Sequence, residues 1–262
     1  MLGRATITGI GWLTLAYLLL PLVVVLGSSL TASQFLAFPP KGWTLDWYRQ
    51  VLLDQSYIDA FKTSTLLAAT ATLIAVILGL AASLGLSRDA DSGRSLLSAL
   101  FMSPLVLPHI VLAAAFLQFC AQVGLIRTYW AFLLGHALIT TPFVIQAVVP
   151  LLTHEQRTLE EASLDLGAGP FETFCYITFP LVRSGIISGG LFAFISSWIN
   201  VEMSMFNTTA SMTTVPVKLL NHVQYQVDPL IAAVSGITIL AAAAVIVAID
   251  YTIGLEMLAE KK

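Results

Sequence analysis

The sequence predicts an all-α membrane protein with six transmembrane helices, and its composition and hydropathy pattern support this class. Of the 262 residues, 57% are hydrophobic and only 10% are charged, with a mean hydropathy of +0.87. Soluble domains carry about 25% charged residues. Apolar runs recur along the chain, each long enough to cross about 30 Å of hydrocarbon at about 1.5 Å per residue. Such runs are too long for barrel strands, so we expect helices.

Six runs are the predicted spans: 8–29, 62–86, 97–121, 129–152, 184–206 and 230–253. No polar segment between them is long enough for a separate core, so we expect one transmembrane domain over 1–262. The first run follows Arg4 and resembles a secretory signal, but we expect it to remain as a span.

An even number of spans places both termini on one side of the membrane. With the termini inside, that face holds seven of the twelve basic residues and the other face holds five. This small excess favours cytoplasmic termini. The inner seven are Arg4, Arg88, Arg94, Arg157, Arg183, Lys261 and Lys262; the outer five are Lys41, Arg49, Lys62, Arg127 and Lys218.

The longest segment outside the spans, about 30–61, contains FPPKGWTLDWY. Its prolines and glycine predict a turn before a short amphipathic stretch. Trp43, Trp47 and Tyr48 suit the membrane–water boundary, so we expect them to be interfacial anchors.

The third run contains SPLVLPHIVL, with Pro104 and Pro108 four residues apart. Each proline removes a helix hydrogen bond, so we expect a bent or interrupted helix, as either a structural kink or part of a transport pathway. Cys120 and Cys175 fall on opposite sides of the predicted membrane and cannot pair, so we expect packing roles.

A polar insert, LEEASLDLGAGPFETFCYITFP, separates the fourth and fifth runs at residues 159–180. One helical stripe combines Leu159, Ala162, Ser163 and Leu166, with Glu160, Glu161 and Asp165 facing away from it.

After this stripe, Gly167 suits a left-handed stop, and Pro170 with Glu172 suits the first turn of a new helix. The insert is therefore predicted to form a helix, a glycine turn and a second helix. Periodicity alone allows a helix on the membrane surface or one that docks in a partner's groove.

The order Glu161-Ala162-Ser163, three residues, Gly167, nine residues and Ile177-Thr178-Phe179-Pro180 resembles the EAA loop of binding-protein-dependent ABC importer permeases. The segments FPPKGWTLDWY and TTVPVKLLNHV are similar to the second permease type of spermidine/putrescine importers. The resemblance therefore covers most of the chain.

This resemblance implies a type I importer fold in a bacterial-type cytoplasmic (inner) membrane. It implies that the loop at about 153–183 is a cytoplasmic coupling helix that contacts an ATPase dimer. The implied partners are that dimer, which would bind ATP and Mg²⁺, a second permease and an extracytoplasmic binding protein. The second permease is expected to be a distinct chain, with a second copy of this chain as the alternative. The coupling residues implied are Glu160, Glu161, Ala162, Ser163, Asp165, Gly167 and Pro180.

The chain itself is expected to be a transport subunit without catalytic residues, metal or cofactor. It lacks the G-x-x-x-x-G-K-[ST] loop that cradles nucleotide phosphates. It also has no paired carboxylates, metal-spaced histidines or nucleophile–base pair, and no basic patch for nucleic acid. The alternative is a secondary transporter or channel without an ATPase, but we find no internal repeat, and Glu202 and Asp250 are the only acids in the last two runs.

The candidate translocation-path residues are His109, Trp198, Asn200 and Glu202. Phe194, Trp198 and Glu202 are spaced four residues apart, so they would share a helix face suited to an amine-bearing group, whereas Asn200 would point elsewhere. Glu202 equally suits the outer interface.

Two of these positions bear on the cargo. Where polyamine importers commonly carry acids, this chain has His109 and Ile199-Asn200. The sequence therefore leaves the cargo open.

Overall fold

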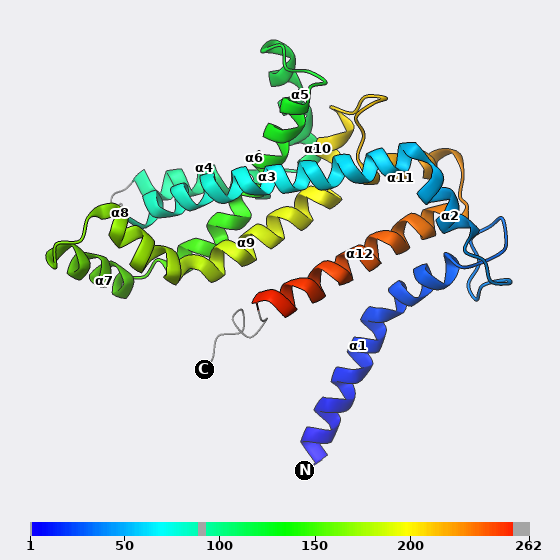
Figure 1. Ribbon diagram of the computed structural model, residues 1–262, viewed down its shortest axis with the longest axis horizontal. Coiled ribbons are helices and arrows are strands. Elements are labelled where there is room, and N and C mark those ends of the chain that lie inside the picture. Colours follow the sequence, from blue (N-terminus) through cyan, green and yellow to red (C-terminus); the bar gives the residue numbers. More distant parts are fainter. Residues whose placement is uncertain (1, 89–92, 254–262) are drawn as a thin grey trace. The chain divides into compact units, whose positions relative to one another are not determined.

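The computed structural model describes residues 2–88 and 93–253, and every regular element in these ranges is helical (Figure 1). The prediction of an all-α chain is confirmed. Several residues used above lie outside the described residues or have undescribed side chains: Arg4, Arg88, Arg94, Asp250, Lys261 and Lys262.

The helices in chain order are α1 (Leu2–Ser28), α2 (Asp46–Leu53), α3 (Gln55–Arg88), α4 (Gly93–Val106), α5 (His109–Gln122), α6 (Tyr129–Val148), the short η1 (Val149–Leu151), α7 (His154–Asp165), α8 (Pro170–Thr173), the π-helical turn η2 (Phe174–Thr178), α9 (Phe179–Ile199), α10 (Glu202–Met205), α11 (Val215–Tyr225) and α12 (Pro229–Ile253).

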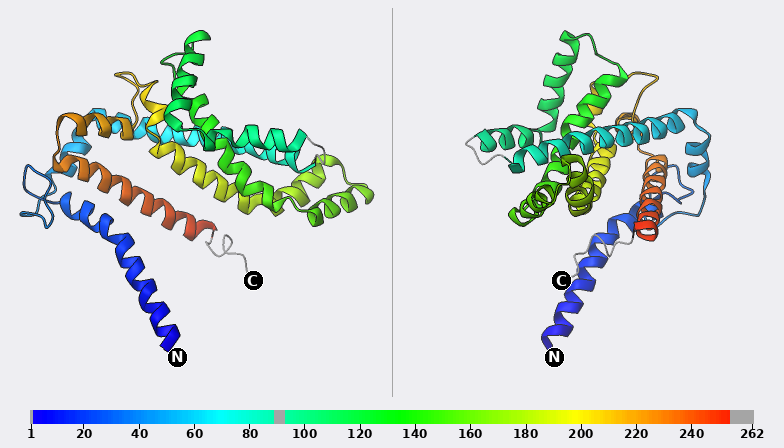
Figure 2. Two further views of the ribbon diagram at one scale, coloured as in Figure 1. Left: turned by 180° about the vertical axis from the view of Figure 1, so that it is seen from behind. Right: turned by 60° about the vertical axis from the view of Figure 1, so that its left-hand side comes forward.

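Four helices within the described ranges are long and apolar enough to cross a membrane: Thr6–Ser28, Gln55–Ser87, Tyr129–Leu151 and Pro170–Ile199. A fifth span results if α4 and α5, which are bent by 105°, are counted together (Figure 2). The sixth predicted run falls in α12, whose apolar part is the shorter Pro229–Val245. The chain is therefore a multi-pass membrane protein, whereas the count of six spans remains a prediction.

The predicted interruption of the third run is confirmed at Pro108, which precedes α5. Pro104 instead stays inside α4. A proline at this position cannot donate to the Leu100 carbonyl. The Ser103 hydroxyl donates to that oxygen over 2.7 Å and so replaces the missing hydrogen bond.

The described chain forms two compact units, one made of residues 2–59 and 218–253 and the other of residues 60–88 and 93–217. In the second unit, α6 is buried along most of its length and packs lengthwise on α9. The close approach requires glycine: a Cβ on Gly185 would lie 2.6 Å from the Ala147 carbonyl oxygen, and one on Gly189 would lie 2.8 Å from the Val144 Cα. Small residues four apart commonly bring membrane helices this close.

In the first unit, the loop before α2 folds over the end of α1. The Trp47 indole donates to the Thr31 carbonyl oxygen over 2.9 Å, and the Tyr48 hydroxyl lies 2.7 Å from that of Ser29. Trp47 is buried and Tyr48 half-buried, while Trp43 is exposed. The prediction of three interfacial anchors is therefore wrong for Trp47, which packs inside this unit, and it stays a prediction for Trp43 and Tyr48.

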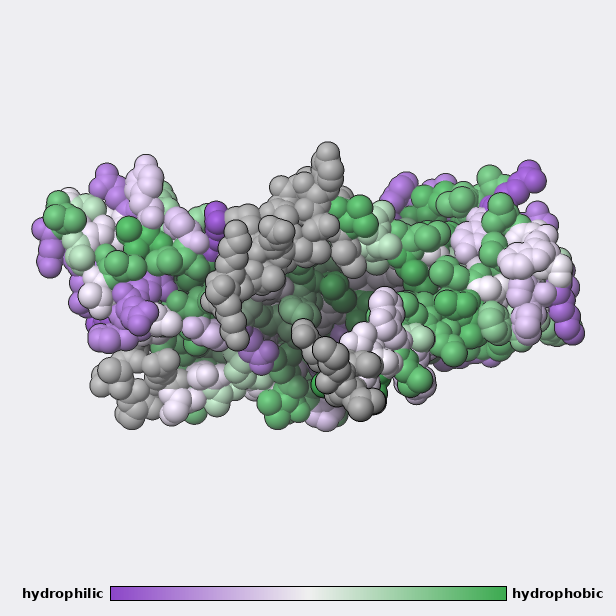
Figure 3. All heavy atoms as spheres, turned by 90° about the horizontal axis from the view of Figure 1, so that it is seen from below, coloured by the Kyte–Doolittle hydropathy of each residue, from purple (hydrophilic) through white to green (hydrophobic). Residues whose placement is uncertain are grey.

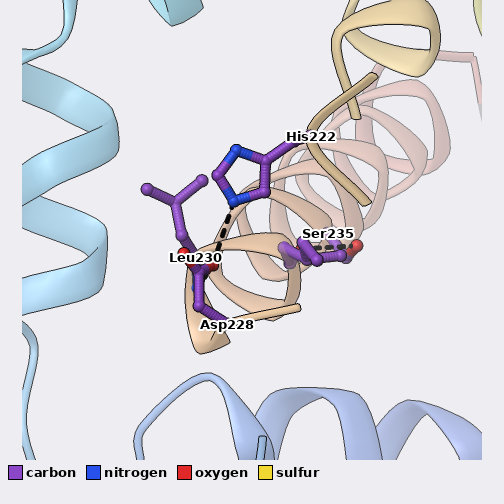
Figure 4. A network of polar contacts seen from close by, with 5 residues as sticks. His222, Asp228, Leu230 and Ser235 are labelled. Carbon is purple, nitrogen blue, oxygen red and sulfur yellow. Dashed lines mark hydrogen bonds and ion pairs between the residues drawn. The ribbon is translucent and has the colours of Figure 1, made fainter. Parts of the chain in front are cut away.

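The start of α12 is held by Asp228, which directly precedes it (Figure 4). The Leu230 backbone N–H donates to the Asp228 carboxylate over 3.1 Å, and His222 Nε2 lies 3.1 Å from the same oxygen. One carboxylate oxygen thus caps α12 and joins it to the end of α11.

Candidate functional site

The polar insert forms a helix, a glycine turn and a second helix, as predicted. The Thr153 side chain caps the start of α7. After α7, Gly167 adopts φ +92, with its N–H bonded to the Leu164 carbonyl and the Ala168 N–H bonded to the Ser163 carbonyl. This pair of hydrogen bonds is the Schellman motif, which needs a left-handed residue at this position.

The second helix begins at Pro170, and the Glu172 carboxylate accepts from the Gly169 N–H over 2.9 Å. The helix then continues as the wider π-helical turn η2 before α9. At the end of η2 the Phe179 N–H bonds to the Phe174 carbonyl, five residues back. Pro180 follows at once, so the wide turn lies where a proline disturbs regular α-helical bonding.

One face of α7 packs against its own chain through polar contacts. The Thr178 hydroxyl donates to the Glu160 carboxylate over 2.5 Å, and the hydroxyls of Ser163 and Thr173 lie 3.1 Å apart. Gln156, one turn before Glu160, is buried. Ser163, predicted to belong to the apolar stripe, is half-buried and turns toward α8.

The rest of the predicted stripe is uncovered within the described chain. Leu159, Ala162 and Leu166 are exposed, with Leu166 at 90%. Glu161 and Asp165 are also exposed, and Glu161 pairs with Arg157 at 3.2 Å. An exposed pair of this kind is worth about 0.3–0.5 kcal/mol, so it orients Glu161 rather than stabilising the helix.

More apolar side chains follow on the same insert: Phe171 and Tyr176 are 77% and 78% exposed. Beside them, a cavity of about 240 Å³ lies between α7, α8 and η2, with Glu160, Glu161 and Phe174 among its lining residues. Hydrophilic residues also gather at the end of the second unit where α7 and α8 lie (Figure 3). Exposed apolar groups rimmed by charge are typical of protein-interaction surfaces.

The second candidate region is a break in the helix that follows the insert. α9 ends at Ile199, Asn200 is extended (φ −72, ψ 118), and α10 begins at Glu202. The prediction that Trp198 and Glu202 share a helix face with Phe194 is therefore wrong, because the helix does not continue between them.

A buried polar network stabilises this break. His136, on α6, is completely buried, with Nδ1 2.8 Å from the Ser197 hydroxyl and Nε2 3.0 Å from the Ser204 hydroxyl. Ser204 also donates to the Asn200 carbonyl over 2.9 Å, and the Asn200 side-chain oxygen accepts from the Met203 N–H over 2.8 Å.

These contacts define the tautomer of the histidine. The Ser204 hydroxyl has one proton, which goes to Asn200, so it accepts from the N–H on Nε2 of His136. In a neutral ring Nδ1 then has no proton and is the acceptor for the Ser197 hydroxyl. The network links α6, α9 and α10.

Sequence reasoning missed His136 and both serines, although a lone histidine in the fourth apolar run was a usable signal. Polar residues inside spans are rare and usually find partners.

The other candidates lie apart from this network. Trp198 is half-buried, its indole 3.3 Å from the Thr65 hydroxyl and its ring 6.1 Å from that of Phe61. Glu202 is half-buried in α10, and His109 is half-buried at the start of α5. No hydrogen bond or ring contact among the described residues joins His109 to Trp198 or Glu202.

In the first unit, a charged cluster lies at the turn before α3 and at the start of that helix. The Ser56 hydroxyl donates to the Asp54 carboxylate and lowers the pKa of that carboxyl. Lys218 bonds to the same hydroxyl and lies 4.3 Å above the Tyr57 ring. This cluster joins the α2–α3 turn to α11, in the TTVPVKLLNHV segment.

Comparison with known proteins identifies the family. Residues 75–254 match the family described as the binding-protein-dependent transport system inner membrane component. The chain belongs to this family.

Curated relatives of the permease cover most of its length. It is 26% identical over 248 residues to the spermidine/putrescine transport system permease protein PotC of Escherichia coli (strain K12), covering 95% of this chain and 94% of the relative. It is 31% identical over 204 residues to the putrescine transport system permease protein PotI of the same strain, covering 74% and 72%.

The fold of the permease also matches a solved structure. A chain from the crystal structure of a bacterial ABC transporter involved in import of the acidic polysaccharide alginate superposes with a TM-score of 0.72, at 16% identity, covering 96% of the permease and 95% of that chain. The chain is thus an ABC importer permease and a multi-pass inner-membrane protein.

Proposed function

We propose that this permease forms part of the translocation path of an ATP-driven importer and couples to a cytoplasmic ATPase dimer through α7 and α8. The observation that carries the proposal is the uncovered face of the insert, where Leu159, Leu166 and Phe171 are exposed beside Glu161. A short helix with one apolar face and a charged rim suits a partner's groove.

The Schellman turn supports a mechanical role for the insert. Gly167 sets the angle between α7 and α8, while Glu160 and Ser163 tie α7 to residues that lead directly into α9. A displacement of α7 by the ATPase would therefore pass into α9 and toward the break at Asn200. ATP and Mg²⁺ would be bound by the ATPase, because this chain has no phosphate-binding loop.

The proposed assembly also contains a second, distinct permease and an extracytoplasmic binding protein. The full importer would have both termini of this chain in the cytoplasm, with residue 165 inside and residue 46 outside. The two polyamine permeases among the relatives suggest an amine-bearing cargo, which Trp198 and Glu202 suit by an aromatic face and a carboxylate. The absence of acids at His109 and Ile199-Asn200 argues against a polyamine bound in their usual manner.

Copurification tests the partner, and a glycine substitution tests the coupling. Gly167→Val places a β-branched residue at φ +92, a conformation costing about 1–2 kcal/mol for a residue with a side chain. We expect the assembled complex to keep its ATPase subunits but to hydrolyse ATP without the matching uptake of cargo.

Gly124→Val is the matched control. Gly124 also has positive φ (+73), and neither glycine has an atom within 4 Å of an added Cβ. Both variants thus carry similar backbone strain, but Gly124 lies outside the insert. Equal uncoupling by both variants, or normal coupled uptake in Gly167→Val, would contradict the proposed role.

A further inference from the structure

An apolar groove of about 700 Å³ opens in the first unit between α1, α2 and α12. Six leucines line it, among them Leu26, Leu52 and Leu240, and its polar lining residues are Tyr48 and Arg49. A groove this apolar in a membrane protein is filled by hydrocarbon or by another protein.

Arg49 occupies an unusual place on α2. Trp47 and Val51 form the buried face of this helix. Leu45, Arg49 and Leu52 are spaced four and three apart on the exposed face, so the charge stands among leucines rather than on a polar face. Arg49 is exposed, and no ion pair among the described residues neutralises it.

The groove is lined by residues near the end of α1 and by one residue well inside α12. Leu26 and Leu30 lie at the end of α1, near Ser28, where the chain leaves the apolar region. Leu240 lies eleven residues beyond Pro229 at the start of α12, or about 16 Å along the helix. A residue this far along a helix that starts at the membrane surface lies near the middle of a hydrocarbon core about 30 Å thick.

We propose that the groove binds a phospholipid with an anionic headgroup. The Arg49 guanidinium pairs with the phosphate region, since its planar fork matches phosphate oxygens. One acyl chain lies along the leucines down to Leu240. The long arginine stem covers apolar surface while its charge reaches the headgroups. This site is independent of the ATPase contact and of the cargo.

The test uses the assembled, delipidated complex in mild detergent, titrated with phosphatidylglycerol or with phosphatidylcholine of the same acyl chains and followed by native mass spectrometry. Arg49→Gln removes the charge from the groove. Lys41→Gln is the matched control, because it removes an exposed cation of the same unit outside the groove lining.

We expect phosphatidylglycerol to bind the wild type and Lys41→Gln alike, and Arg49→Gln about ten- to a hundredfold more weakly. This range is the worth of one hydrogen bond to a charged group expressed as a ratio of binding constants. Arg49→Lys should bind between the two. Leu240→Trp, which fills the bottom of the groove, should weaken binding although Arg49 is unchanged.

Three results would overturn the proposal: equal weakening by Arg49→Gln and Lys41→Gln, equal binding of the two lipids by the wild type, or no effect of Leu240→Trp. A cysteine at Leu52 that crosslinks efficiently to the second permease would also overturn it, because a protein would then fill the groove.

Discussion

Removing each serine that contacts His136 should destabilise the protein by different amounts. Ser197→Ala removes one hydrogen bond, the donation to Nδ1 of His136. Ser204→Ala removes two, because Ser204 accepts from Nε2 and donates to the Asn200 carbonyl. Side-chain hydrogen bonds inside membrane proteins are worth about 0.6 kcal/mol on average. We therefore expect losses of about 0.6 kcal/mol for Ser197→Ala and about 1.2 kcal/mol for Ser204→Ala.

Both serines are buried and both substitutions remove a single oxygen, so the difference measures hydrogen bonding rather than packing. The assay is equilibrium unfolding of the purified permease in mixed micelles of mild detergent and SDS. Adding His136→Phe to Ser197→Ala completes a double-mutant cycle, which should give a coupling of about 0.6 kcal/mol. Equal losses for the two serines would refute the proton assignment in the network, and a coupling near zero would refute the hydrogen bond between Ser197 and His136.

Two further predictions concern topology and transport. In a background without the native cysteines, Asp46→Cys should react with an impermeant thiol reagent on intact cells and Asp165→Cys only after lysis; the opposite pattern would reverse the proposed orientation. In reconstituted complexes with normal basal ATPase activity, Trp198→Ala and Glu202→Gln should slow uptake or change selectivity, since both would lose contacts suited to an amine. Unchanged rate and selectivity in both would leave Glu202 as an interfacial residue.

Local backbone chemistry made the insert predictable from sequence. The positive φ of Gly167 and the capping by Glu172 depend on residues a few positions apart, so the pattern in LEEASLDLGAGPFET was sufficient. The interruption at Pro108 was predictable for the same reason: proline has no N–H to donate.

The break at Asn200 depends on contacts distant in sequence and was missed. Asn200 itself permits a helix, and the run from 184 to 206 is apolar enough to suggest continuity. Around the end of α9, Ser197 and Ser204 form hydrogen bonds with His136, which lies 61 and 68 residues away in the sequence. Likewise, the packing of Trp47 under the Thr31 carbonyl turned an expected interfacial anchor into a core residue.

Crosslinking from the insert tests the central claim, the contact between α7 and an ATPase, most directly. Leu166→Cys places a thiol at the most exposed apolar position of the insert, and Arg127→Cys provides an exposed control in the α5–α6 connection, which the proposed topology places outside. In complexes assembled in native membranes, we predict that a short bifunctional reagent joins position 166, but not position 127, to the ATPase subunit. An ATPase that copurifies but crosslinks to neither position, or equally to both, would contradict the account.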